Sequence, residues 1–300
     1  QSGSCRVYNA TFLSPVAEYL SQECSTGHFR LVLPCGPVRG IVVHTAATNT
    51  EDYDSRQEKL AEPLLEHGIA SLIMLVPYYG VRRAKGQTSS KLLTVAEYQL
   101  QNLGVVTEGV ALLRWLHAAY PSVPLGVTGI SWGGAMASCI GVVCRLPIAC
   151  VPCLGSTSPA CMVTGVINWQ IDWPKLQAEQ SHSLAEAKHM LEAEFRGITL
   201  KTLVETTPLH FLPTIISMVQ VSARSDHFVQ DWEGQALYDA ISPACQAHSL
   251  RWVDGGHVAS FVRADVDFIS AIVVAFEEMS AGSCISSNTQ GDAVLKSEST

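Results

Sequence analysis

The chain has 300 residues, of which 47% are hydrophobic and 15% are charged, with a net charge of -8 at pH 7. This length and composition allow one large domain with a buried core. The acidic balance argues against a nucleic-acid partner, because phosphate contacts need clustered lysines and arginines and the longest basic run is Arg82-Arg83.

The apolar stretches are too short to cross a membrane. The longest, Ile69 to Val76 and Phe268 to Phe276, fall below the roughly 18 residues that a membrane-spanning helix needs. We therefore expect a soluble chain with no transmembrane segment. The sequence begins at Gln1 without a basic segment followed by an apolar one, which indicates a processed or partial chain.

Cysteine placement bears on the compartment and on metal binding. Cys139, Cys144, Cys150 and Cys153 lie in apolar segments, where a free cysteine packs as a small hydrophobic residue, which favours a reducing intracellular compartment such as the cytoplasm or an organelle. Cys150 and Cys153 form a C-x-x-C pattern, for which a redox pair is the alternative to core packing. No second cysteine pair or H-x₃-H lies nearby, so we expect neither a metal site nor a cofactor.

Strands and helices alternate along the chain. Several predicted strands are apolar throughout, as expected of a parallel strand that is covered on both faces. The predicted strands are Phe29–Pro34, Gly40–His44, Ala70–Pro77, Leu125–Ile130, Ile148–Leu154, Ile215–Ala223 and Leu250–Val253. This order predicts an α/β fold with a central, mostly parallel sheet flanked by helices.

Two segments between and after these strands carry apolar residues at intervals of three and four, which is typical of helices that pack on a sheet. The first contains Leu103, Val106, Val110, Leu113 and Leu116, and the second contains Phe261, Phe268, Ile272 and Phe276.

The alternation breaks between Ser156 and Pro213. Within this stretch, Ser183 to Glu186 has the spacing of a capping box and predicts the start of a helix. We interpret residues 156–213 as an insertion between two core strands that acts as a lid. After Met279 the sequence turns to small and polar residues, which predicts a domain over residues 1–279 and a disordered tail over 280–300.

A G-x-S-x-G pattern spans Gly129 to Gly133, directly after the predicted strand Leu125–Ile130. A serine on a strand-to-helix turn is typical of a nucleophile elbow, where strained backbone projects the hydroxyl and strand and helix approach so closely that little beyond glycine fits. The helix N-terminus directs N–H groups and partial positive charge at a developing oxyanion, with the backbone of Trp132 as the first donor. We therefore predict that Ser131 is a nucleophile rather than a serine in a glycine-rich turn.

The base and the acid of such a site follow the serine along the chain. His257 lies after an apolar strand and two glycines, where a loop can bring it over the sheet edge. No Asp or Glu occurs between Ser131 and Asp172, whereas Asp226 follows the end of the next core strand. We therefore favour Asp226 as the acid, and Asp254, three residues before His257, is the alternative.

Two more loops follow strands on the same predicted edge. The loop after Gly40–His44 contains small residues that let backbone come close, so we predict Ala46 as the second oxyanion donor, with Ala47 as the alternative. The loop after Ala70–Pro77 carries a set of large polar side chains. Its tyrosines could line the acyl pocket and its arginines could bind an anionic group, or the loop could be capped with solvated arginines. These residues are Tyr78, Tyr79, Arg82 and Arg83.

Five stretches together resemble the family of α/β-hydrolase domain-containing protein 18. They read VPYYGVRR at 76–83, TGISWGGAMAS at 128–138, VPCLGSTSPACMVTGVI at 151–167, ARSDHFV at 223–229 and DGGHVASF at 254–261. The resemblance spans roughly His44 to Phe276. It implies an α/β-hydrolase fold and the roles of nucleophile, acid and base for Ser131, Asp226 and His257.

The sequence thus predicts a serine hydrolase that cleaves a small-molecule or lipid ester through an acyl-enzyme. Two alternatives stay open. The same three residues could pass the acyl group to an alcohol as in an acyltransferase, or the fold could be a non-catalytic binding scaffold. The sequence indicates no particular protein partner.

Overall fold

The computed structural model describes residues 5–92, 94–159, 173–174, 177, 183–197, 200–206 and 215–295. At its centre is an eight-stranded sheet in the order β1-β2-β4-β3-β5-β6-β7-β8. The strands are β1 (Cys5–Leu13), β2 (Thr26–Pro34), β3 (Gly40–His44), β4 (Ile69–Leu75), β5 (Leu125–Ile130), β6 (Ile148–Cys153), β7 (Ile215–Ala223) and β8 (Cys245–Val253). From β4 to β8 all neighbours are parallel, whereas β1–β2 and β2–β4 are antiparallel. The predicted fold class is therefore confirmed.

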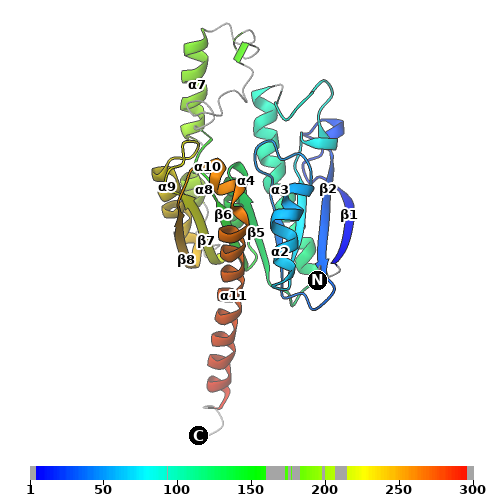
Figure 1. The fold of residues 1–300 in the computed structure, drawn as a ribbon, viewed down its shortest axis with the longest axis vertical. Helices are drawn as coiled ribbons and strands as arrows, with labels where there is room; N and C mark the ends of the chain where they lie inside the picture. The colour runs from blue at the N-terminus through cyan, green and yellow to red at the C-terminus, as the bar shows by residue number, and fades with distance from the viewer. Residues whose placement is uncertain are drawn as a thin grey trace.

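Helices cover both faces of this sheet (Figure 1). The α-helices are α1 (Asp54–Arg56), α2 (Glu62–Leu65), α3 (Val95–Ala119), α4 (Trp132–Val143), α7 (Leu184–Gly197), α8 (Leu200–Thr206), α9 (Asp231–Ile241), α10 (His257–Val262) and α11 (Ala264–Leu295). The shorter turns are η1 (Gln22–Cys24), the π-helical η2 (Gln57–Ala61), η3 (Gly80–Arg82) and η6 (Ser242–Ala244). One face packs against α3, α4 and α9, and the other against α2 and α11.

Strand β1 is absent from the strands predicted from the sequence. It lies at the edge of the sheet, and six of its nine residues are exposed. An edge strand of this kind has no continuous apolar run, and its alternation is weak because only one neighbour covers it. The central strands, in contrast, are buried along their whole length in β3, β4, β5 and β6.

The apolar stripe of α11 packs on the sheet as predicted. Phe268, Ile272 and Phe276 are buried, and the ring of Phe276 lies where a side chain on Gly40 or Gly126 would collide with it. These two glycines therefore let the helix approach the middle of the sheet closely.

The stripe predicted for α3 is only partly correct. Leu113 and Leu116 are buried, but the side chain of Leu103 is 44% exposed. The buried side of the helix also includes Val105 and Leu112.

The stretch predicted as an insertion lies between β6 and β7, which are neighbours in the sheet. Within it, Ser183 and Glu186 form the predicted capping box, since the Glu186 amide donates to Ser183 Oγ at 3.3 Å and the Ser183 amide to Glu186 Oε2 at 2.8 Å. Helix α7 begins there and extends beyond the sheet, at the end of the molecule opposite the C-terminus (Figure 1). Most of 160–182 and all of 207–214 lie outside the described residues.

The C-terminal segment, for which the sequence predicts a disordered tail, is described as far as Leu295. Helix α11 continues through Leu295, and its last turns extend away from the sheet (Figure 1). No proline interrupts the helix after its last core contacts near Met279. Residues 296–300 lie outside the described part of the chain. None of the described helices is both long enough and apolar enough to span a membrane.

Candidate active site

Ser131 occupies the turn between β5 and α4. Its backbone has φ 60° and ψ -124°, a conformation that an ordinary residue adopts only under strain, at a cost of about 1–3 kcal/mol. The turn is fixed on both sides, because the Ser131 amide donates to the Cys153 carbonyl at 2.9 Å and the Ser131 carbonyl accepts from the Ala135 amide at 3.2 Å. The predicted strand-to-helix turn is therefore present, and Ser131 stands at the N-terminus of α4.

Gly129 and Gly133 make this turn possible. A side chain on Gly129 would collide with Thr45 Oγ1 and with the backbone of Gly133, and one on Gly133 would lie 2.7 Å from the Ala46 carbonyl oxygen. Both positions therefore exclude a Cβ atom, as the sequence pattern predicts. Thr45 Oγ1 donates to the Gly133 carbonyl at 2.7 Å and so joins the elbow to the end of β3.

His257 and Asp226 meet where the loops after β8 and β7 lie together, on the far side of β6 from the elbow's strand β5. Nδ1 of His257 lies 2.6 Å from Oδ2 of Asp226, and the side chains are 10% and 1% exposed. The other carboxylate oxygen, Oδ1, accepts from the Phe228 amide at 2.8 Å and the Val229 amide at 2.9 Å. These bonds fix the carboxylate, and the carboxylate fixes the ring, so that Nε2 of His257 is the nitrogen left for a reacting group.

The loops that carry this pair are shaped by glycine and by ring stacking. Gly255 has φ +111°, and the Ser225 amide donates to its carbonyl at 3.1 Å, which holds the β8 loop against the β7 loop. The ring of Phe228 stacks on His257 with a centroid distance of 5.0 Å. Asp254, the alternative acid, is exposed, and its carbonyl accepts from Arg263 at 3.0 Å. The structure therefore places Asp226 next to His257 and leaves Asp254 on the surface.

The loop after β3, which we call the β3 loop (residues 45–53), lies against the elbow. Ala46 is fully buried with its carbonyl facing Gly133, and Ala47 is almost as buried. Thr48 lines the same cavity as Ser131. The loop predicted to supply the second oxyanion donor is therefore adjacent to the turn that carries Ser131, and the choice of Ala46 over Ala47 stays a prediction.

The loop after β4 (residues 76–92), here the β4 loop, differs from its prediction. Tyr78 and Tyr79 are 1% and 3% exposed, and the Tyr79 hydroxyl accepts from the Asn49 amide at 3.2 Å. Burial raises the pKa of Tyr79 to about 12. Arg83 is 37% exposed and pairs with Glu51 at 2.7 Å, and Glu51 also accepts from the Gly80 amide at 2.9 Å. These contacts connect the β4 loop to the β3 loop.

Arg82 is not solvated, which differs from the alternative prediction of a loop with solvated arginines. Its side chain is completely buried and forms a two-pronged ion pair with Glu108 of α3, with N–O distances of 2.6 and 2.8 Å. It also donates to the carbonyls of Leu75 at 2.7 Å and Cys24 at 2.5 Å. Arg82 thus connects β4, α3 and η1. No local pattern in the sequence indicates this pairing, because Glu108 lies 26 residues away from Arg82.

A cavity of about 390 Å³ opens at Ser131 and runs along α4. One face of α4 lines it at intervals of three and four, namely Trp132, Ala135, Met136, Cys139 and Val143, over a length of about 16 Å. Leu103 and Val106 of α3 and Leu200 and Leu203 of α8 complete the apolar wall. None of Tyr78, Tyr79, Arg82 and Arg83 is among the described residues that line this cavity, and their contact with substrate stays a prediction.

Sequence reasoning missed the residues of this cavity. Leu103 and Val106 belonged to a helical stripe that we assigned to the sheet, and the exposure of Leu103 has its reason in the cavity. Trp132 turns its ring to the same cavity, and its Nε1 donates to Asn102 Oδ1 of α3 at 2.9 Å. The one signal of this cavity in the sequence is the position of Trp132, directly after Ser131.

Cys150 and Cys153 belong to the core. They lie three residues apart on β6, so their side chains point to opposite faces of the sheet and pack in two different clusters. Burial raises the pKa of both thiols, and both are free. An inert, separated pair of this kind does not support redox chemistry. Within the described residues, no group of three or more His, Cys, Asp or Glu side chains is arranged to hold a metal ion.

Comparison with known proteins adds a family and a fold. The model of the family described as alpha/beta hydrolase domain containing 18 matches residues 1–278. Among solved structures, the esterase Pf2001 of Pyrococcus furiosus superimposes with a TM-score of 0.59 at 14% identity, covering 92% of this chain and 91% of that one.

Two further structures agree with this fold. The protein TT1662 from Thermus thermophilus gives a TM-score of 0.58 at 16% identity, covering 91% of this chain and 99% of that one. A cold-adapted esterase from an Arctic intertidal metagenomic library gives 0.56 at 15% identity, covering 89% and 93%. At these identities the likeness establishes the fold alone.

Proposed function

Because the chain belongs to the α/β-hydrolase domain-containing protein 18 family, we propose that it is a serine hydrolase that cleaves a carboxylic ester through an acyl-enzyme. Ser131 is the nucleophile, His257 the general base and Asp226 the residue that orients the base. The observation that carries the proposal is the 2.6 Å bond between His257 and Asp226 at the edge where the strained Ser131 turn opens into a cavity. Fold similarity to esterases is consistent with the same chemistry.

The first half of the reaction forms the acyl-enzyme. Ser131 Oγ attacks the ester carbonyl carbon while Nε2 of His257 takes the hydroxyl proton. The carbonyl oxygen becomes an oxyanion, which the Trp132 amide and an amide of the β3 loop stabilise at the N-terminus of α4. When the tetrahedral intermediate collapses, the bond to the leaving oxygen breaks, and that oxygen takes the proton from His257 and departs as an alcohol.

The second half returns the enzyme to its starting state. A water molecule gives a proton to His257 Nε2 and attacks the acyl carbon. The second tetrahedral intermediate collapses, Ser131 Oγ recovers the proton, and a carboxylic acid leaves. Asp226 stays ionised throughout and stabilises the imidazolium that forms in each half.

The cavity suggests the substrate class. Its wall is largely apolar and begins at Ser131, so it fits the acyl part of an ester better than a polar group. We therefore propose a lipid or other acyl ester as substrate. Leu200 and Leu203 belong to the segment between β6 and β7 and form part of the wall, which supports a lid role for that segment.

The direct test is labelling with a fluorophosphonate probe, which reacts with an activated serine. We expect one adduct on Ser131 by mass spectrometry, and we expect Ser131→Ala to abolish both labelling and hydrolysis of p-nitrophenyl octanoate. Ser225→Ala, which changes an exposed serine next to Asp226, is the matched control and should keep both. An adduct on another serine, or full activity in Ser131→Ala, would contradict the proposal.

A further inference from the structure

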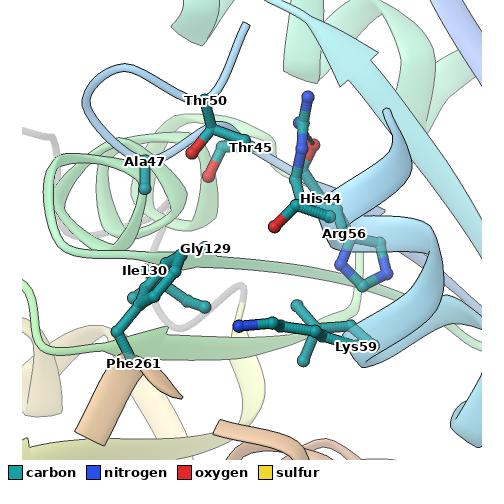
Figure 2. A pocket seen from close by; sticks show the side chains of 11 residues that line it. His44, Thr45, Ala47, Thr50, Arg56, Lys59, Gly129, Ile130 and Phe261 are labelled. Carbon is teal, nitrogen blue, oxygen red and sulfur yellow. Dashed lines mark hydrogen bonds between the residues drawn. The ribbon is translucent and has the colours of Figure 1, made fainter. Parts of the chain in front are cut away.

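A second, much smaller cavity lies behind the elbow. It has a volume of about 20 Å³ and shares no lining residue with the cavity at Ser131. Four segments form its wall (Figure 2): the end of β3 with its loop, the end of β5 at Gly129 and Ile130, the α1–η2 segment, and α10 through Phe261. The hydroxyl-bearing residues Thr50 and Ser55 are among its lining residues.

Arg56 brings a positive charge to this cavity. The side chain is 5% exposed, and its guanidinium donates to three backbone carbonyls, those of Met74 and Asp52 at 2.7 Å and of His44 at 3.3 Å. Nε of Arg56 has no hydrogen-bond partner. Burial lowers the pKa of Arg56 to about 10, so the group keeps its charge at neutral pH.

No carboxylate neutralises Arg56 by direct contact among the described residues. Asp52 raises the pKa of Arg56 through space, but its side chain is exposed and only its backbone carbonyl accepts a hydrogen bond from the guanidinium. Buried arginines are ordinarily paired with an acid, as Arg82 is with Glu108. The wall of the cavity contains no Asp or Glu.

Lys59 adds a second cation. Its side chain is half-buried, its Nζ lies 5.2 Å from the centre of the Phe261 ring, and within the described residues it makes no ion pair. Figure 2 shows the amino group of Lys59 directed into the space among the labelled residues, on the side of Phe261 and Ile130. His44, also in the wall, has an unpartnered Nδ1, while its Nε2 is 2.9 Å from Ser71 Oγ.

We propose that this cavity binds one small inorganic anion of halide size, such as chloride, between Arg56 and Lys59. Two cations without an acidic partner and the hydroxyls of Thr50 and Ser55 provide charge and donors for an anion. The volume decides the size of the ligand, because about 20 Å³ holds one water-sized particle and not a phosphate or a carboxylate ligand. A water molecule fits the space but does not neutralise the charges.

A bound anion would connect the α1–η2 segment to the β3 loop and to the end of β5, so it should stabilise the native state. Binding does not depend on ester hydrolysis, and the proposal can hold or fail independently of the proposed function. Its readouts are therefore unfolding and diffraction rather than turnover.

The first test compares thermal unfolding in sodium chloride with that in sodium gluconate at equal ionic strength, because gluconate is too large for the cavity. For a dissociation constant of about 10 mM, 100 mM chloride should raise the Tm by about 3 °C over gluconate. Lys59→Gln should reduce this difference, whereas Lys85→Gln, the same charge change at an exposed position outside the cavity, should keep it. Equal Tm values in the two salts, or an unchanged difference in Lys59→Gln, would overturn the proposal.

The second test supplies the missing carboxylate. Thr50→Asp places an acid in the wall of the cavity, where it can pair with Arg56 or Lys59, and the Tm should become independent of chloride. Thr50→Asn, which has nearly the same shape without the charge, should keep the chloride dependence. Crystals grown in sodium bromide should give an anomalous peak in the cavity of the wild-type protein and none in Thr50→Asp. A cavity that holds only water in bromide would exclude an anion site.

Discussion

The elbow at Ser131 and the β4 loop leave neighbouring parts of the same sheet edge, yet their polar residues have opposite surroundings. At the elbow a strained backbone and two glycines direct Ser131 to a cavity of about 390 Å³. In the β4 loop, Arg82 turns inward and is enclosed by Glu108 and two backbone carbonyls. Position at the carboxyl edge of a sheet therefore does not by itself make a residue part of a site. A long polar side chain can instead be bound by a partner within the protein.

Among the variants considered, replacement of the proposed acid Asp226 should have the largest effect on activity. In Asp226→Asn, the side-chain amide would donate to His257 Nδ1 and force the proton onto Nε2, so the ring could no longer accept the serine proton. We expect turnover to fall by about 10⁴-fold, as for loss of a comparable acid elsewhere, while the protein stays folded. Steady-state kinetics with p-nitrophenyl octanoate and far-UV circular dichroism measure the two effects.

Asp254→Asn is the matched control for this prediction, because Asp254 is exposed and its side chain is not the partner of His257. It should change turnover less than tenfold. The reverse order of the two variants would assign the orienting role to Asp254 and break the contrast between a cavity-facing and an enclosed set of residues.

The elbow was predictable because its cause is local. Gly129, Ser131 and Gly133 lie within five residues, and the strand before them is apolar throughout, so pattern and physical reason coincide. The proposed acid was chosen by a similar argument, since Asp226 directly follows the end of a core strand, and the structure places it next to His257. The choice of His257 as the base followed from the two glycines that precede it after the last predicted strand. Three strands, β3, β5 and β7, have the predicted bounds for the same reason.

The β4 loop was not predictable because its partners are distant. Glu108 is 26 residues from Arg82 and Cys24 is 58 residues away, and nothing in the local pattern distinguishes Arg82 from Arg83. The cavity was missed for a related reason. Its walls come from α3, α4 and α8, and periodicity identifies an apolar face without saying whether a sheet or a cavity lies against it.

Replacement of Arg82 in the β4 loop should have the second-largest effect, and this effect should fall on the free energy of unfolding. Arg82→Met leaves Glu108 buried without its partner, which should lower the free energy of unfolding by about 3–5 kcal/mol. The double variant Arg82→Met/Glu108→Leu should recover most of that loss, because no unpaired charge remains in the interior. Urea unfolding of the two variants and of the wild type gives the three free energies.

Arg83→Gln provides the exposed counterpart. The pair of Arg83 with Glu51 is partly solvated, so its loss should change the free energy of unfolding by about 1 kcal/mol or less.

The opposite result for Arg82 would contradict the buried ion pair. If Arg82→Met left the free energy of unfolding unchanged and raised the KM for an anionic ester, Arg82 would contact substrate, and the inward orientation described above would be wrong.

A smaller effect than that of Arg82→Met concerns the pH dependence of stability and His44, a third polar residue at this edge. It ends β3, is 1% exposed, and has a pKa of about 3, lowered by burial and further by the charge of Arg56. The native state therefore keeps His44 neutral below pH 6.5, whereas the unfolded chain binds a proton there. Stability must then fall as the pH decreases from about 6.5 toward 3, and by pH 5 this group alone should lower the free energy of unfolding by about 2 kcal/mol.

His44→Gln removes the titrating group and can keep a hydrogen bond to Ser71, so its stability should decline less between pH 7 and pH 5 than that of the wild type. His67→Gln, which changes an exposed histidine, should leave the decline unchanged. Urea unfolding at pH 7, 6 and 5 measures both slopes. A wild-type slope in His44→Gln would mean that His44 takes up a proton in the folded state as readily as in the unfolded chain, which requires solvent or an acid at its ring. His44 would then not be enclosed as Arg82 is, and the charge of Arg56 would not be the main influence on its pKa.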